Sequence, residues 1–153
     1  MTICGGGWAG ITPVFGRFDE AARWYQTSLR LAPNVKTFKA AAEMFEKNGN
    51  AQAALTNYLG WIQLEADPFA HIRAAANFSR LGDCAQAISY YRKALALRPD
   101  FVPAMERLAC LLATSRADTC RDGSEAVRLA ERGRERTHAE SASMLGTLAA
   151  SYE

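Results

Sequence analysis

Three glycines, Gly16, Gly49 and Gly82, stand 33 residues apart, and the residues that follow each of them repeat as well. Small, aromatic and aliphatic residues recur at fixed distances after each glycine. The recurring sets are Ala21, Ala54 and Ala87; Tyr25, Tyr58 and Tyr91; Leu29, Ile62 and Leu95; and Leu31, Leu64 and Leu97. A fixed period of this size is typical of a stacked repeat protein. Such proteins present an extended surface to another macromolecule, and this favours binding over catalysis.

Composition and charge narrow the class further. The 153 residues are 49% hydrophobic and 22% charged, as in ordinary globular proteins, and alternating strand patterns are hard to find, so we predict an all-α class. The net charge of only +2 disfavours nucleic-acid binding, which usually needs a larger, clustered basic excess. No apolar run approaches the roughly 18 residues of a membrane span. Residues 1–15 lack the basic start of a secretory signal.

The cysteines and histidines indicate no metal site. No two cysteines form a CxxC pair, and none clusters with a histidine in the sequence. We therefore expect reduced, partly buried thiols in a cytoplasmic protein, in preference to a disulfide. The residues concerned are Cys4, Cys84, Cys110 and Cys120, with His71 and His138.

Capping residues and helix breakers divide each period into two amphipathic helices. In the clearest unit, Asp67 can cap a helix with Pro68 at its first position, and Gly82 can end it in the left-handed conformation. Asp83 can cap a second helix, which Pro99 stops. The same plan predicts helices over residues 18–31, 35–47, 51–64, 68–81, 84–98, 101–114, 124–136 and 140–152.

Two segments depart from this plan. Residues 1–15 are rich in glycine and contain Pro13, so we expect an irregular segment there. The connection over residues 115–123 is about five residues longer than the usual turn of the period. In addition, Trp61 stands where the next unit has Ala94, and this large-for-small change predicts a local difference in helix spacing.

The pattern resembles the tetratricopeptide repeat over about residues 16–153. In the clearest unit the matching positions are His71, Ala74, Ala75, Phe78, Gly82, Ala87, Tyr91, Ala94 and Pro99. The departures are Trp61 for the usual Ala, Ala66 for Pro and His71 for Trp. Residues 108–114, 121–131 and 148–152 are similar to a bacterial form of the repeat.

The resemblance implies an α-solenoid of antiparallel helix pairs wound into a right-handed superhelix. After the irregular segment over 1–15, it implies a repeat domain over 16–153. This domain would comprise a partial repeat over 16–34, repeats over 35–67, 68–101 and 102–137, and a final helix over 138–153.

The resemblance also implies a non-enzymatic scaffold that binds a protein or peptide in a concave groove lined by the first helices. By register, the residues facing that groove are Lys36, Lys39, Glu43, Lys47, Phe69, Arg73, Asn77, Arg80, Glu106 and Arg107. The set predicts a mildly basic groove for an acidic segment or a C-terminal carboxylate, because arginine pairs with carboxylates in a bidentate manner. Each residue taken singly also fits a solvated charge on a helix face.

No arrangement typical of a catalytic triad, a phosphate loop or a cofactor site occurs in the sequence. Two alternatives stay open beside the scaffold. The chain can be a regulatory or substrate-presenting segment of a larger enzyme such as a glycosyltransferase, a setting in which the bacterial form of the repeat is found. It can also self-associate through the final helix, whose apolar stripe lacks a following helix. That stripe is Met144, Leu145, Leu148 and Tyr152.

Overall fold

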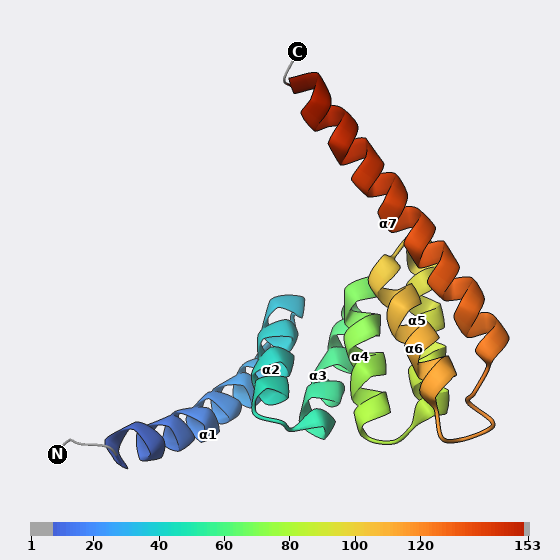
Figure 1. Ribbon diagram of the computed structural model, residues 1–153. Coiled ribbons are helices and arrows are strands. Elements are labelled where there is room, and N and C mark those ends of the chain that lie inside the picture. The colour runs from blue at the N-terminus through green and yellow to red at the C-terminus, as the bar shows by residue number, and fades with distance from the viewer. Residues whose placement is uncertain (1–7, 152–153) are drawn as a thin grey trace. The chain divides into compact units, whose positions relative to one another are not determined.

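The computed structural model describes the backbone of residues 8–151 and the side chains of residues 17–138. All regular structure in this range is helical, which confirms the all-α class (Figure 1). The helices are α1 (Trp8–Leu31), α2 (Val35–Lys47), α3 (Ala51–Leu64), α4 (Pro68–Arg80), α5 (Cys84–Leu97), α6 (Val102–Thr114) and α7 (Gly123–Ser151). The bounds of α2 to α6 agree with the predicted helices to within one residue.

The chain divides into two compact units, Met1–Leu64 and Glu65–Glu153, which we call the first and the second unit. In the first unit α2 and α3 pack as an antiparallel pair, and α1 contacts α2. In the second unit α4 pairs with α5, α6 pairs with α7, and α5 packs against α6 (Figure 1). Antiparallel pairing of consecutive helices is therefore confirmed within each unit.

The predicted caps account for the helix starts in the second unit. One carboxylate oxygen of Asp67 accepts hydrogen bonds from the backbone N–H groups of Phe69 and Ala70, at 2.7 and 3.1 Å. Asp83 accepts one from the N–H of Gln86 at 3.1 Å. These bonds satisfy N–H groups that the first turn of a helix leaves without an internal partner. The cap residues thus fix where α4 and α5 begin.

Gly82 allows the tight turn between α4 and α5, because its backbone has φ of 86°. A side chain in this left-handed region costs roughly 1–2 kcal/mol. We therefore expect Gly82→Ala to lower the free energy of unfolding by about 1 kcal/mol in urea denaturation followed by circular dichroism. Gly123→Ala is the matched control, since a Cβ there meets open space and φ is not positive. Equal losses from both substitutions would contradict this account of the turn.

Small and large residues alternate in the core of the second unit. Ala75, Ala87 and Ala94 are fully buried at the helix crossings, where small side chains let the backbones approach closely. Met105 and Leu108 of α6 are also fully buried and fill the space beside them. The repeated Ala and large apolar positions of the sequence therefore form one continuous core in this unit.

Trp61 is part of the buried core of the first unit. The indole is 4% exposed, and its ring centroid lies 6.4 Å from that of Tyr58. The preceding residue on α3 is Gly60, and a Cβ built there would overlap the ring of Phe38 on α2. The ring of Phe38 therefore rests directly on the backbone of α3. Only glycine next to Trp61 permits this arrangement.

Two expectations about the ends of the chain are wrong. Helix α1 begins at Trp8, so residues 8–15 are helical and not irregular, while residues 1–7 lie outside the described range. Gly10 and Pro13 both disfavour helix formation, but they fall in the first two turns of a 24-residue helix. The remaining turns outweigh their cost in helix stability. At the other end, α7 runs without a break from Gly123 to Ser151, where two helices were expected.

The continuity of α7 has a local cause. No glycine or proline occurs between Gly133 and Gly146, so the expected connection near His138 contains no helix breaker. The hydroxyl of Thr137 donates a hydrogen bond to the backbone oxygen of Gly133 at 2.9 Å, as it would in an uninterrupted helix. Polar composition alone does not end a helix here.

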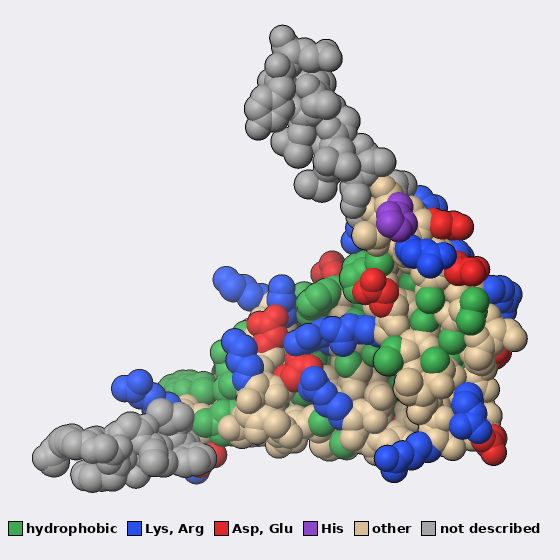
Figure 2. Space-filling model, viewed as in Figure 1, with side chains coloured by type: hydrophobic (Ala, Val, Ile, Leu, Met, Phe, Trp, Pro, Cys, Tyr) green, Lys and Arg blue, Asp and Glu red, His purple; other side chains and the backbone are tan. Residues whose placement is uncertain are grey.

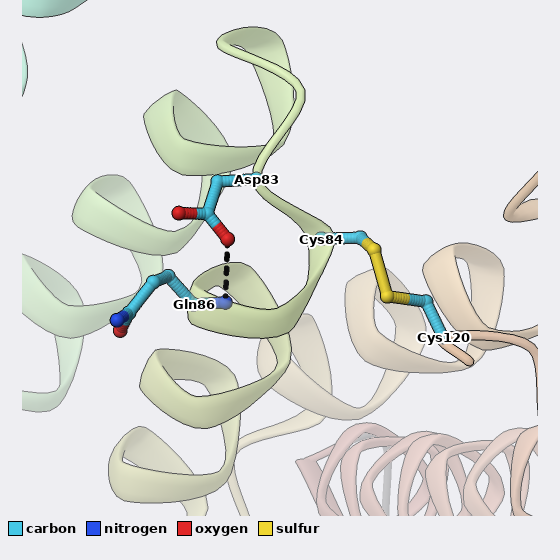
Figure 3. Close-up of a disulfide and its surroundings, with 4 residues drawn as sticks. All are labelled: Asp83, Cys84, Gln86 and Cys120. Carbon is cyan, nitrogen blue, oxygen red and sulfur yellow. Dashed lines mark hydrogen bonds between the residues drawn. A yellow bond between two sulfur atoms is a disulfide. The ribbon is translucent and has the colours of Figure 1, made fainter. Parts of the chain in front are cut away.

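The expectation of reduced thiols is wrong for one pair of cysteines. Cys84 and Cys120 form a disulfide, with their Cα atoms 6.2 Å apart (Figure 3). Cys84 begins α5, and Cys120 belongs to the long connection before α7, which folds back so that Asp122 N–H bonds to the Leu112 backbone oxygen at 3.0 Å. Cys110 is an exposed free thiol. The disulfide thus anchors the inserted connection to the start of α5.

Candidate functional site

The residues expected to face a binding groove fall on both units. Lys36, Lys39 and Glu43 lie on α2 of the first unit, where the two lysines are exposed and the glutamate is half-buried. The Lys39 ammonium lies 5.8 Å from the centre of the Trp61 ring, within range of a cation–π contact. These three residues give α2 a polar face of mixed charge.

Helix α4 carries three further residues of the expected set along one face. Phe69, Arg73 and Arg80 are four and seven residues apart, and this spacing keeps them on the same side of a helix. Phe69 is 43% exposed, and the Arg73 guanidinium lies 5.8 Å from the centre of its ring. The face therefore offers an apolar ring with one guanidinium group beside it and a second about two turns further along α4.

Arg107 of α6 and Arg80 of α4 both act on Tyr91, which the sequence indicated only as a core residue. The Tyr91 ring is 4% exposed, and its hydroxyl is within hydrogen-bonding reach of Arg107. Burial raises the pKa of the Tyr91 phenol above 10.0, against the opposing charges of Arg107 and Arg80. Three helices thus place two guanidinium groups within electrostatic range of a neutral phenol. We call Arg80, Tyr91 and Arg107 the arginine–tyrosine site.

Asn77 does not face a groove, contrary to expectation. It is fully buried and continues the buried stripe of α4 formed by Ala70 and Ala74, because residues 70, 74 and 77 share one face. Its Nδ2 donates to the backbone oxygen of Arg73 at 2.9 Å, and its Oδ1 has no hydrogen-bond partner. Register placed this asparagine in the groove, but its side chain lies on the buried face of α4.

The arginine–tyrosine site is suited to holding an anion. Guanidinium groups bind carboxylates through paired, charge-assisted hydrogen bonds, and a protonated phenol can donate another. On the visible face of the described residues, basic and acidic side chains are intermixed (Figure 2). An anion would therefore be recognised by this local arrangement and not by a broad basic field.

Neither a metal-binding cluster nor a membrane-spanning helix is found in the described part of the chain. Among these residues no group of three or more His, Cys, Asp and Glu is placed to hold a metal ion. His71 is buried, and its Nδ1 lies 2.7 Å from the backbone oxygen of Asp67, as expected of a packed histidine. None of the described helices is both long and apolar enough to cross a membrane.

The sequence did not indicate a second surface feature, an open groove between α6 and α7 of about 930 Å³. We call it the α6–α7 groove. Small and apolar side chains line most of it, and hydrophobic side chains are exposed over these helices in Figure 2. The lining residues include Ala109, Cys110 and Ala113 of α6 with Ala126, Val127 and Ala130 of α7. Its rim carries Glu106, Arg121 and Arg134.

Comparison with known proteins agrees with the fold. Residues 70–101 match the family model of the tetratricopeptide repeat. A crystal structure of MamA is similar, with a TM-score of 0.68 and 20% identity over 81% of this chain and 71% of that chain. A MamA RS-1 double mutant gives a TM-score of 0.71 at 16% identity, over 85% of this chain and 71% of the other. No curated protein matches the sequence. At such identities the likeness concerns the fold.

Proposed function

We propose that this tetratricopeptide-repeat protein is a non-enzymatic scaffold that binds a protein or peptide at the arginine–tyrosine site. The carrying observation is that Arg107 on α6 and Arg80 on α4 both lie close enough to the buried Tyr91 phenol on α5 to oppose the rise of its pKa. Packing fixes the backbone positions from which these groups extend, so a ligand would have to order only the exposed side chains of Arg80 and Arg107.

The ligand we propose is an acidic segment or a C-terminal carboxylate. A carboxylate matches the two guanidinium groups in charge and in hydrogen-bond geometry. Phe69 and Arg73 lie further along α4, where they could contact an apolar residue and a second acidic residue of the same segment. An extended peptide would then follow α4 and place its carboxylate between Arg80 and Arg107.

The test uses dye-labelled peptides and fluorescence anisotropy. An acidic peptide with a free C-terminus is compared with its C-terminal amide and with a version in which Asp and Glu are replaced by Asn and Gln. We expect Arg80→Glu and Arg107→Glu each to weaken binding of the acidic peptide at least about tenfold, because a hydrogen bond to a charged group contributes about 1.5–3 kcal/mol. The amide comparison shows whether the C-terminal carboxylate is the anion recognised.

Arg116→Glu is the matched control, since this arginine is exposed in the connection between α6 and α7. It makes the same change in net charge outside the arginine–tyrosine site. Equal weakening by Arg116→Glu would show that only long-range charge matters. Equal affinity for the acidic and the neutral peptide would argue against the proposed ligand.

A further inference from the structure

Among the described residues, no first helix packs beside the α6–α7 pair of the second unit. Helix α6 follows the α4–α5 pair and packs against α5, burying Met105, Leu108 and Leu112. After the α6–α7 pair no such helix follows within the described residues, and the α6–α7 groove remains open. Val127, which lines the groove, is 57% exposed. The small side chains of the groove, Ala113 and Ala130 among them, would let another helix approach closely.

The second half of α7 has the sequence of such a first helix. Leu145, Leu148, Ala149 and Tyr152 are spaced by three, one and three residues. The inward residues of the two preceding first helices, beginning at His71 and at Met105, have the same spacing. The backbone of α7 is helical to Ser151 and runs beyond the other helices of the second unit (Figure 1). The chain therefore contains both a vacant helix position and a segment with the pattern to fill it.

The segment cannot fill the groove of its own chain while α7 is continuous. The last groove-lining residue on α7 is Arg134. At a rise of 1.5 Å per residue, Ala149 lies about 22 Å further along the helix axis. The helix that forms one wall of the groove thus carries the segment away from it. A second copy of the chain has an identical segment and an identical groove.

We propose that two copies of this chain exchange the second halves of α7, each half lying in the α6–α7 groove of the other copy. In a two-fold arrangement both grooves are filled and both segments are bound, so no surface remains for a third copy. The charges agree with this pairing. After Ala139 the only charged residues are Glu140 and Glu153, and two of the three charged residues at the groove rim are Arg121 and Arg134.

The test measures the mass of the full chain by light scattering after size-exclusion chromatography, at about 100 μM. We expect the native chain at twice its own mass of 16.7 kDa. Val127→Glu blocks the groove and Leu148→Glu blocks the segment, and each should give a monomer with native helical circular dichroism. Arg128→Glu is the control on the exposed surface of α7 and should remain a dimer. A native monomer, or a dimer that neither blocking variant disrupts, would overturn the proposal.

Mixing the two blocked variants tests the mechanism without relying on loss of function. The Leu148→Glu chain keeps an intact groove, and the Val127→Glu chain keeps an intact segment. We expect the mixture to form a one-to-one complex, whereas two monomers in the mixture would contradict helix exchange.

The exposed thiol of Cys110 lines the groove. Its alkylation, followed on its tryptic peptide, should therefore be about tenfold slower in the native dimer than in Leu148→Glu. Equal alkylation rates would likewise count against the proposal.

Discussion

Replacing both Cys84 and Cys120 with alanine is expected to lower the free energy of unfolding of the second unit by about 4 kcal/mol. The two cysteines are 36 residues apart, and a cross-link that closes a loop of this length removes much of the entropy of the unfolded chain. The bond also ties the inserted connection to the start of α5, where Cys120 is 4% exposed within the core. The disulfide thus adds a covalent contact to the hydrogen bond from Asp122 N–H to the Leu112 backbone oxygen, which also holds this connection.

Urea denaturation followed by circular dichroism, with and without a reducing agent, measures this effect. The native chain should lose about the same stability on reduction as the double variant loses by substitution, and the double variant should not respond to the reductant. Cys110→Ala is the matched control, because Cys110 is an exposed free thiol and surface substitutions usually change stability by less than about 0.5 kcal/mol. A native chain with four titratable thiols and no response to reduction would refute the prediction.

The disulfide also bears on where the protein resides. Thiols in the cytoplasm are normally kept reduced, whereas structural disulfides persist in oxidising compartments. The cytoplasmic location expected from the sequence was tied to the expectation of reduced thiols, and the Cys84–Cys120 bond opposes the latter. Acid quenching of intact cells followed by alkylation in denaturant, which exposes the buried Cys120, distinguishes the two cases. Modified Cys84 and Cys120 would support a reducing compartment, and protected ones an oxidising compartment.

Local signals were sufficient to predict α2 to α6. A cap such as Asp67, a left-handed glycine such as Gly82 and a stop such as Pro99 act within a few residues of the position they mark. Their effect does not depend on the rest of the fold. At both ends of the chain these signals were weak or conflicting, and there the sequence misplaced the start of α1 and wrongly divided α7.

Features that depend on contacts between distant residues could be predicted only in part. Register placed Phe69, Arg73 and Arg80 on one face of α4, but it could not show that the hydroxyl of Tyr91 meets Arg107. The Cys84–Cys120 bond required the inserted connection to fold back, and no local pattern states the path of such a connection. The sequence nevertheless contained one signal for this disulfide. Cys84 begins α5 and Cys120 lies three residues before the start of α7, and equivalent ends of successive second helices lie close together in stacked repeats.

Trp61→Ala is expected to destabilise the first unit by about 3–5 kcal/mol, although alanine is the usual residue at this position of the repeat. Agreement with a repeat pattern would suggest the opposite result, a gain in stability. The local packing decides against that gain. The indole is 4% exposed and lies beside the ring of Tyr58, so its removal is expected to leave a cavity in the core.

A further reason lies in the contact between Phe38 and Gly60, the residue before the tryptophan. Because Gly60 has no side chain, the ring of Phe38 already rests on the backbone of α3, and α2 and α3 have little room to move closer together. The site therefore collapses poorly, and the cavity term adds to the lost burial. Trp24→Ala is the matched control, since Trp24 is 67% exposed and its loss should change stability by less than about 1 kcal/mol.

Hydrogen exchange provides the local measurement for this substitution. In Trp61→Ala we expect amide protons of α2 and α3 to exchange faster, while those of α5 and α6 in the second unit keep their native rates. Faster exchange throughout the chain would mean that the two units unfold together and not separately. Unchanged or slower amide exchange in α2 and α3 would show that alanine can replace Trp61 without changes at neighbouring residues. In that case Trp61, Gly60 and Phe38 would not be a coupled set.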